Sequence, residues 1–168
     1  TVTVVPLPAL TLGATGPADA TCGDEITVTI AAVSGFTDLI SLQYSVNWDT
    51  TKLKYVSHSA ANIGVMGGAP SIGVGSDYLA YTWFDSGMTL GGQVMMNGAA
   101  LLTITFKVRT NGPSTAVSIT GTPLSFLVDD YNFCSGTVAL MPGNVNVTLN
   151  PITVTCPSDF AVCIDEPA

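Results

Sequence analysis

The segment 41–57, SLQYSVNWDTTKLKYVS, decides the fold that this sequence predicts. Its first half alternates polar residues with four apolar ones: Leu42, Tyr44, Val46 and Trp48. Successive side chains of a β-strand point to opposite faces, so this alternation predicts a half-buried strand. Residues 49–52 are turn-prone, and a shorter apolar run follows at 53–56. Because the aromatic-rich face needs a second layer to cover it, the segment predicts a β-sandwich.

The same alternation recurs along the rest of the chain. Segments 26–30, 78–84 and 102–109 each alternate apolar with polar side chains, and turn signals such as Asn97-Gly98 separate the runs. No segment holds the i, i+3, i+4, i+7 pattern of a helix for three turns. Short strands at intervals of about 8–12 residues predict an all-β fold, a two-sheet antiparallel β-sandwich.

We expect the chain to divide into three parts: 1–8, 9–150 and 151–168. The first run, TVTVV, is cut off by Pro6 and Pro8, so it cannot continue into the next strand. It is either an N-terminal linker or a strand donated to a neighbouring molecule, and the donated side chains would be Val2, Val4 and Val5. The sandwich occupies 9–150. Residues 151–168 are a linker, the first strand of a following module, or a tail between subunits.

Composition excludes several functional classes. Charged residues make up 10% of the 168 residues, against about 25% in an average globular protein, and mean hydropathy is +0.48. A chain this apolar suggests self-assembly or a permanent protein partner. The net charge of −8, with only four cationic side chains, argues against nucleic acids and anionic membrane surfaces. No apolar run approaches the roughly 20 residues that span a bilayer.

The four cysteines are Cys22, Cys134, Cys156 and Cys163, and none of them forms a CxxC pair. Since His58 is the single histidine, a structural zinc site is disfavoured. An even number of cysteines favours two disulfides in an oxidising compartment, hence a secreted or cell-surface protein. Three pairings are possible. We favour Cys22–Cys134 with Cys156–Cys163, and free buried thiols are the alternative.

Candidates for catalysis are few, so we expect no enzymatic activity and no cofactor. His58 follows an apolar run beside two serines, but the sequence has no GxSxG elbow for a nucleophile. Asp129 and Asp130 are adjacent, so on a strand they point to opposite faces and cannot act as a glycosidase pair. With Asp85 they could hold a structural Ca²⁺. The aromatic residues of 44–48 and 81–83 could stack on a sugar, as in a carbohydrate-binding module, but their place on the apolar face favours core packing.

Three blocks of sequence, in order, resemble cohesin and cohesin-like modules: GDEITVTI at 23–30, SVNWDTTKLKYV at 45–56 and NGAALLTITFKV at 97–108. The resemblance covers about residues 9–150. The segment ITVTCPSDF at 152–160 resembles the opening of a hyalin-repeat-type adhesion module, of the kind found in long bacterial surface proteins. The chain departs from the cohesin pattern in its cysteines, its N-terminal run and a glycine-rich stretch at 60–75.

The cohesin resemblance implies a nine-stranded, jelly-roll-like sandwich that is not catalytic and binds a dockerin domain on a flat sheet face containing the central strand. In this sequence the outward residues of that strand are Gln43, Ser45 and Asn47, with Asp49 at its end. Outward residues on strands expected beside it are Ala80, Thr82, Thr103 and Thr105.

Two functional hypotheses follow. The first is an extracellular assembly module, a building block of a filament or adhesin joined to its neighbours by strand pairing through the termini. The alternative is a cohesin-type receptor for a dockerin-like partner, without self-assembly. Low charge and the unassigned ends favour the first, whereas the resemblance favours the second.

Overall fold

The computed structural model describes residues 9–34, 38–63, 68–86, 91–94, 96–110, 112–133, 135–140 and 144–150. Val2, Val4, Val5, Cys134, Cys156 and Cys163 lie outside the described residues, as does the whole of 151–168. The donated strand, both disulfides and the hyalin-repeat-like segment therefore stay predictions.

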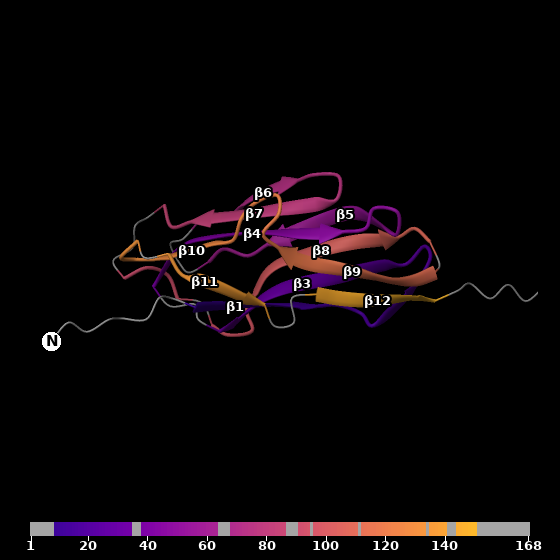
Figure 1. The fold of residues 1–168 in the computed structure, drawn as a ribbon, viewed down its shortest axis with the longest axis horizontal. Helices are drawn as coiled ribbons and strands as arrows, with labels where there is room; N and C mark the ends of the chain where they lie inside the picture. Colours follow the sequence, from indigo (N-terminus) through magenta and orange to yellow (C-terminus); the bar gives the residue numbers. More distant parts are fainter. Residues whose placement is uncertain are drawn as a thin grey trace, which may run out of the picture.

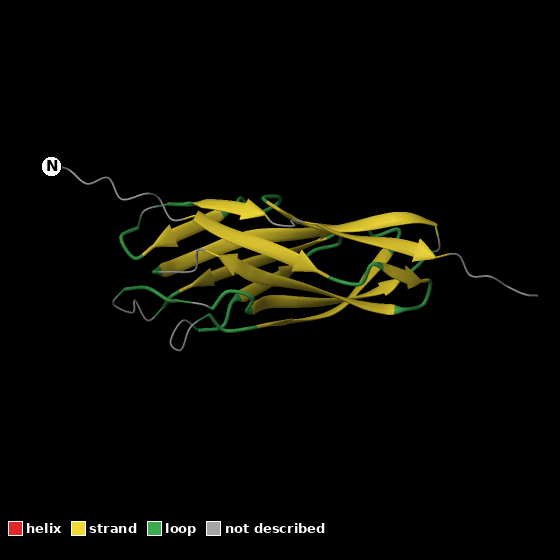
Figure 2. Ribbon diagram, turned by 90° about the horizontal axis from the view of Figure 1, so that it is seen from below, coloured by secondary structure: helices red, strands yellow, loops and turns green. Residues whose placement is uncertain are grey.

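The described residues form twelve β-strands in two stacked layers, which Figure 2 shows from the side. Five make the first sheet, in the order β11-β1-β3-β8-β5, and the second sheet runs β2-β12-β9-β4-β7-β6, with β10 also paired to β4. The strands lie along the long axis of the molecule (Figure 1). Their bounds are β1 Ala9–Thr15, β2 Asp19–Thr21, β3 Glu25–Ser34, β4 Leu39–Trp48, β5 Leu53–Ala60, β6 Ser71–Val74, β7 Tyr78–Phe84, β8 Ala100–Val108, β9 Gly112–Thr120, β10 Leu127–Asp130, β11 Thr137–Leu140 and β12 Asn144–Asn150.

The all-β sandwich predicted from the sequence is confirmed, with twelve strands in place of nine. Part of the excess comes from the first and last strands, each of which is divided into two pieces: β1 and β2, and β11 and β12. β1 pairs in parallel with β11 in the first sheet, whereas β2 pairs in parallel with β12 in the second. The first and last strands thus each contribute to both sheets and close the sandwich along one side. Where the chain leaves β1, a Cβ on Gly16 would meet Val145 Cγ1 at 2.9 Å, so this crossing needs a glycine.

None of the described residues is helical, and the described part of the chain contains no helix that is long and apolar enough to cross a membrane. Several strands, β3, β7 and β9 among them, instead show the period-2 burial that the sequence predicts; β7, for example, alternates half-buried and buried side chains up to Trp83.

The core lies between the sheets and is built around the inner face of β4. Leu42, Tyr44 and Val46 are fully buried, and Trp48 is 6% exposed. Tyr44 stacks on Tyr81 of β7 with ring centroids 4.6 Å apart, and Trp48 meets Phe106 of the opposite sheet edge-on at 5.1 Å. The predicted core role of these aromatic residues is confirmed, which leaves none of them available as a sugar-stacking platform.

The two stacked tyrosines carry their hydroxyls into an apolar interior. In the described structure neither the Tyr44 nor the Tyr81 hydroxyl has a hydrogen-bond partner. Burial raises the pKa of Tyr44 well above 10.0, and the neighbouring Tyr81 adds to this; burial likewise raises the pKa of Tyr81. Both rings must therefore stay neutral in the folded protein at pH values where an unfolded chain would ionise them.

We predict that stability falls steeply above pH 10. A tyrosine whose pKa is higher in the folded than in the unfolded state contributes to the free energy of unfolding. That contribution is complete below pH 10 and is lost as the pH rises toward the folded-state pKa. The slope should reach about 1.4 kcal/mol per pH unit for each buried tyrosine. Denaturant unfolding between pH 8 and 11.5 measures this slope, and Tyr44→Phe should reduce it by about half.

Tyr78→Phe, on the outer face of β7, is the matched control and should leave the slope unchanged. At pH 7 the Tyr44→Phe variant should be as stable as the parent protein or slightly more so, because no hydrogen bond is lost. If Tyr44→Phe loses stability above pH 10 as steeply as the parent protein, the Tyr44 hydroxyl is not buried in its neutral form and the prediction is wrong.

Candidate functional site

The structure brings together one part of the predicted face. Gln43 and Asn47 point outward from β4, and Gln43 lies opposite Thr82 of β7, while Ser45 lies opposite Ala80. Gln43, Asn47, Ala80 and Thr82 are all half-buried. The outer surface of β4 and β7 is thus one continuous surface, as the alternation predicted.

Thr103 and Thr105 do not belong to this surface, which corrects the prediction. Both lie on β8, which pairs with β3 and β5 in the first sheet, and they lie opposite Thr29 and Thr27. Their side chains point away from the sandwich on its other side. The period of a strand fixes which residues share a face, but pairing between distant strands decides to which sheet that face belongs.

Ser45 is also placed differently from the prediction, because it is fully buried. Residues 121–126, which link β9 to β10 and which we call the crossing segment, lie over the outer side of β4. The Ser45 hydroxyl accepts a hydrogen bond from the Leu124 amide at 3.0 Å and donates one to the Leu124 carbonyl at 3.4 Å. The Gln43 side-chain amide donates to the Ser125 carbonyl at 3.0 Å. Two of the three predicted contact residues of β4 therefore bind the chain's own backbone.

The remaining predicted polar residues also have structural partners. Asn47 accepts a hydrogen bond from the Thr120 hydroxyl. Asp49 lies in the turn after β4, where its Oδ1 accepts hydrogen bonds from the Thr51 hydroxyl at 2.6 Å and the Thr51 amide at 2.9 Å. These bonds, the hydroxyl's first, lower the pKa of Asp49. A role for Asp49 in stabilising the turn accounts for its presence.

Two large apolar side chains on the same outer surface were absent from the predicted face. Phe84 of β7 lies opposite Ser41 of β4 and is 48% exposed, and Leu127 of β10 lies opposite Gln43 and is 39% exposed. They flank the start of β4 on either side. The outward direction of Phe84 was predictable from the sequence, because Phe84 follows the buried Trp83 on the same strand and must point to the other face. The exposure of Leu127 on this surface was not predictable, because the position of β10 beside β4 depends on the path of the crossing segment.

The carboxylates that could have formed a calcium site have other described roles. Asp129 accepts hydrogen bonds from the hydroxyls of Ser41 at 2.7 Å and Ser135 at 2.8 Å. Asp130 accepts one from the Asn132 amide, and Asp85 is buried and accepts one from the Gln93 side chain. Among the described residues, no three His, Cys, Asp or Glu side chains gather where they could hold a metal ion. A structural Ca²⁺ stays an untested prediction.

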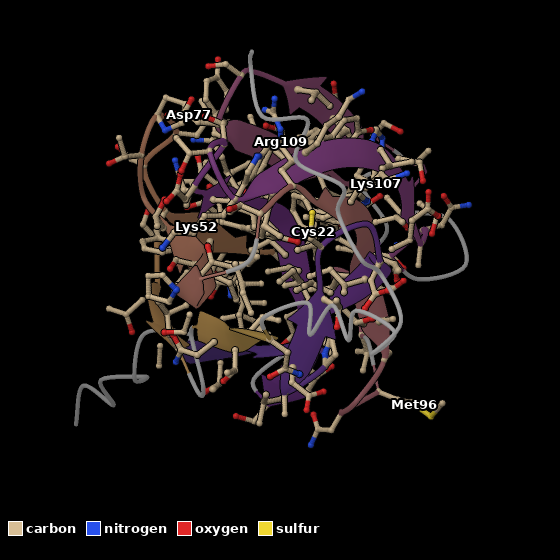
Figure 3. The ribbon with its side chains drawn as sticks, turned by 90° about the vertical axis from the view of Figure 1, so that its right-hand side faces the viewer. Cys22, Lys52, Asp77, Met96, Lys107 and Arg109 are labelled. Atoms are coloured by element: carbon tan, nitrogen blue, oxygen red, sulfur yellow. The ribbon has the colours of Figure 1, made fainter. Side chains whose placement is uncertain are left out.

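His58 and Cys22 complete the predicted candidates. The His58 Nδ1 lies 2.6 Å from the Tyr55 hydroxyl, on the edge strand β5, so its described partner is a tyrosine of its own strand. Cys22 is half-buried in the turn between β2 and β3, near the end of the sandwich shown in Figure 3.

We predict that Ser45→Ala loosens the crossing segment, because the buried Leu124 amide loses its acceptor. An unsatisfied buried donor costs about 1–3 kcal/mol, which corresponds to amide exchange at Leu124 that is about 5- to 150-fold faster. Hydrogen exchange measured by NMR reads this directly. Ser118→Ala, a half-buried serine of the same face on β9, is the control and should leave the exchange of residues 121–126 unchanged. Equal exchange in Ser45→Ala and the parent would contradict the anchoring role.

Comparison with known proteins identifies a family. The family model for the cohesin domain matches residues 14–147. No curated protein matches the chain in sequence.

Solved structures show the same fold at low sequence identity. The sixth cohesin of scaffoldin B from Acetivibrio cellulolyticus, solved in complex with a Cel5 dockerin mutant, has a TM-score of 0.68 at 21% identity and covers 84% of this chain and 99% of its own. A Clostridium thermocellum cohesin, Coh-OlpC, solved with the dockerin Doc435, has a TM-score of 0.67 at 10% identity and covers 89% and 98%. A non-cellulosomal cohesin from the archaeon Archaeoglobus fulgidus has a TM-score of 0.60 at 19% identity and covers 83% and 91%.

Proposed function

This chain belongs to the cohesin family, and we propose that it is a receptor for a dockerin-type protein domain. Cohesin domains are protein-binding modules without catalytic activity, so the expectation that the chain is not an enzyme is confirmed. The observation that carries the proposal is the match of the cohesin model over residues 14–147. Four of the similar solved cohesins are in complex with dockerins, which supports a partner of the same class here.

We place the docking surface on the outer side of the second sheet. The outward side chains of β6, β7 and β4 carry few charges, and Phe84 and Leu127 give this surface an apolar region beside the start of β4. Apolar and aromatic side chains at the centre of an interface supply most of the binding energy, and a polar rim excludes water around them. The crossing segment would form part of that rim, so a partner would contact its backbone instead of Ser45.

The comparisons support this receptor better than the filament hypothesis. Strand donation was predicted from residues 1–8 and 151–168, which lie outside the described residues, and nothing in the described part of the chain bears on pairing between copies. The family match, by contrast, covers most of the described sandwich. We keep a location outside the cell as part of the proposal, in line with the cysteine content.

The test is selection of partners from a displayed library of dockerin domains, with the immobilised chain as bait. The Acetivibrio cellulolyticus cohesin serves as positive control. We expect the chain to enrich a discrete set of dockerins. Failure to enrich any dockerin, while the control enriches its own, would contradict the proposed function.

The location of the surface makes a separate prediction. Thr82→Arg introduces a long charged side chain at the middle of the proposed surface, and we expect it to weaken dockerin binding at least tenfold, about 1.4 kcal/mol. Thr103→Arg is the matched control, because Thr103 is a half-buried strand threonine on the opposite outer surface. Calorimetry of both variants with a selected dockerin decides between the faces, and a greater loss in Thr103→Arg would place the binding surface on the first sheet.

A further inference from the structure

A small hollow lies at one end of the proposed docking surface, beside Phe84, the last residue of β7. This end of β7 is at the left of Figure 1. The volume of the hollow is about 200 Å³, and it is lined by Ile40, Phe84, Asp85, Tyr131 and Phe133. Three of these five residues are aromatic and one is a carboxylate. The volume suits one side chain, and Phe84 also belongs to the apolar region of the docking surface beside the start of β4.

Phe133 is held in an unusual backbone conformation beside this hollow. Its φ is 58°, in the left-handed region that a bulky side chain rarely adopts, and the residue is 68% exposed. The Phe133 amide donates to the Asp130 carbonyl at 2.9 Å, and the Tyr131 amide donates to the Asp38 carbonyl at 2.8 Å. The turn after β10 therefore holds a large apolar ring in water at a strained position. Strain of this kind concentrates at sites of function.

Asp85 gives the hollow a fixed carboxylate. It is 1% exposed, its amide donates to the Ile40 carbonyl at 2.8 Å, and its Oδ2 accepts a hydrogen bond from Gln93 Nε2 at 3.0 Å. Gln93 in turn exchanges two backbone hydrogen bonds with Leu39, at 2.8 and 3.0 Å. The position of the carboxylate is thus set by backbone on both sides.

Charge is distributed unevenly between the two ends of the sandwich. Asp38, Asp85, Asp129 and Asp130 lie at the end with the hollow. The four cationic side chains, Lys52, Lys54, Lys107 and Arg109, lie around the other end, three of them labelled in Figure 3. The ten residues of β4 separate the ends by about 30 Å, which exceeds the Debye length of about 8 Å at physiological ionic strength. The cations of the chain therefore do little to reduce the negative potential around the hollow.

From these observations we propose that the hollow binds a cationic side chain, arginine or lysine, of the protein partner. Aromatic rings attract a cation through their electron-rich faces, and a nearby carboxylate adds a charge of the opposite sign. The negative charge of Asp85 in the lining favours a cation over a neutral side chain of the same size, and it would repel an anion. The hollow adjoins the docking surface at Phe84, so the proposed function supplies the partner from which the cationic side chain would come. The cation site itself does not depend on that function.

The test uses the isolated chain and small probes, so it does not depend on finding a dockerin. The ¹⁵N-labelled protein is titrated with N-acetyl-arginine amide, N-acetyl-lysine amide and N-acetyl-citrulline amide, the last being a neutral analogue of the first. We expect saturable shifts for the amides of Asp85, Gln93, Tyr131 and Phe133 with at least one cationic probe, in the millimolar range of a single side chain. Citrulline should cause no comparable shifts.

Two variants connect the shifts to the hollow. Phe133→Asn removes the ring but keeps a residue that tolerates the left-handed backbone, so it should fold normally and weaken probe binding at least threefold. Val56→Asn, an exposed apolar position on β5 of the first sheet, is the control and should bind as the parent does. Asp85→Asn should abolish the preference for cationic probes over citrulline.

Equal shifts with citrulline, shifts spread over acidic residues at both ends, or undiminished binding in Phe133→Asn would each overturn the proposal. A chain that selects dockerins but shows no cation binding would keep the proposed function and lose this inference. A chain that binds the cationic probes but selects no dockerin would retain the site and place it in recognition of another protein.

Discussion

The fold depends on burying one face of the central strand β4. The inner side chains of β4 pack against the opposite sheet, and β4 pairs along its edges with β7, β9 and β10. Tyr44 and Trp48 are the largest of its buried side chains. Side chains alternate along β4, so the same two-residue period that points these rings inward points every second residue outward. The core and the outer surface therefore follow from one sequence pattern.

The outer surface is shaped by how the chain returns to β4. β9 pairs with the second half of β4 and β10 with the first half, and the six residues between them have to lie over the sheet. The hydroxyl of Ser45 holds that crossing by bonding both backbone groups of Leu124. As a result the polar centre of β4 is covered, and the exposed surface moves toward β7 and toward the end with Phe84 and Leu127. A partner that docks on this surface would therefore contact backbone and apolar side chains more than the polar residues of β4.

Much of this could be predicted from the sequence, because period-2 alternation is a local property. The strand at 78–84, the buried faces of Tyr81 and Trp83, and the outward direction of Gln43 and Thr82 all follow from it, and all are confirmed. The sheet to which Thr103 and Thr105 belong was predicted wrongly, since it depends on pairing β8 with β3 and β5. The burial of Ser45 could not be predicted either, because no local signal shows that residues 121–126 fold over a strand some eighty positions earlier.

The central claim is that the outer side of the second sheet is the surface that binds a protein partner. Hydroxyl-radical footprinting of the chain, alone and saturated with a selected dockerin, tests it most directly, because it reads side-chain exposure on both outer surfaces at once. The account predicts that oxidation of Phe84 and Leu127 falls strongly in the complex while that of Val33 and Val56, on the first sheet, stays the same. Protection of Val33 and Val56 with Phe84 and Leu127 unchanged would contradict it.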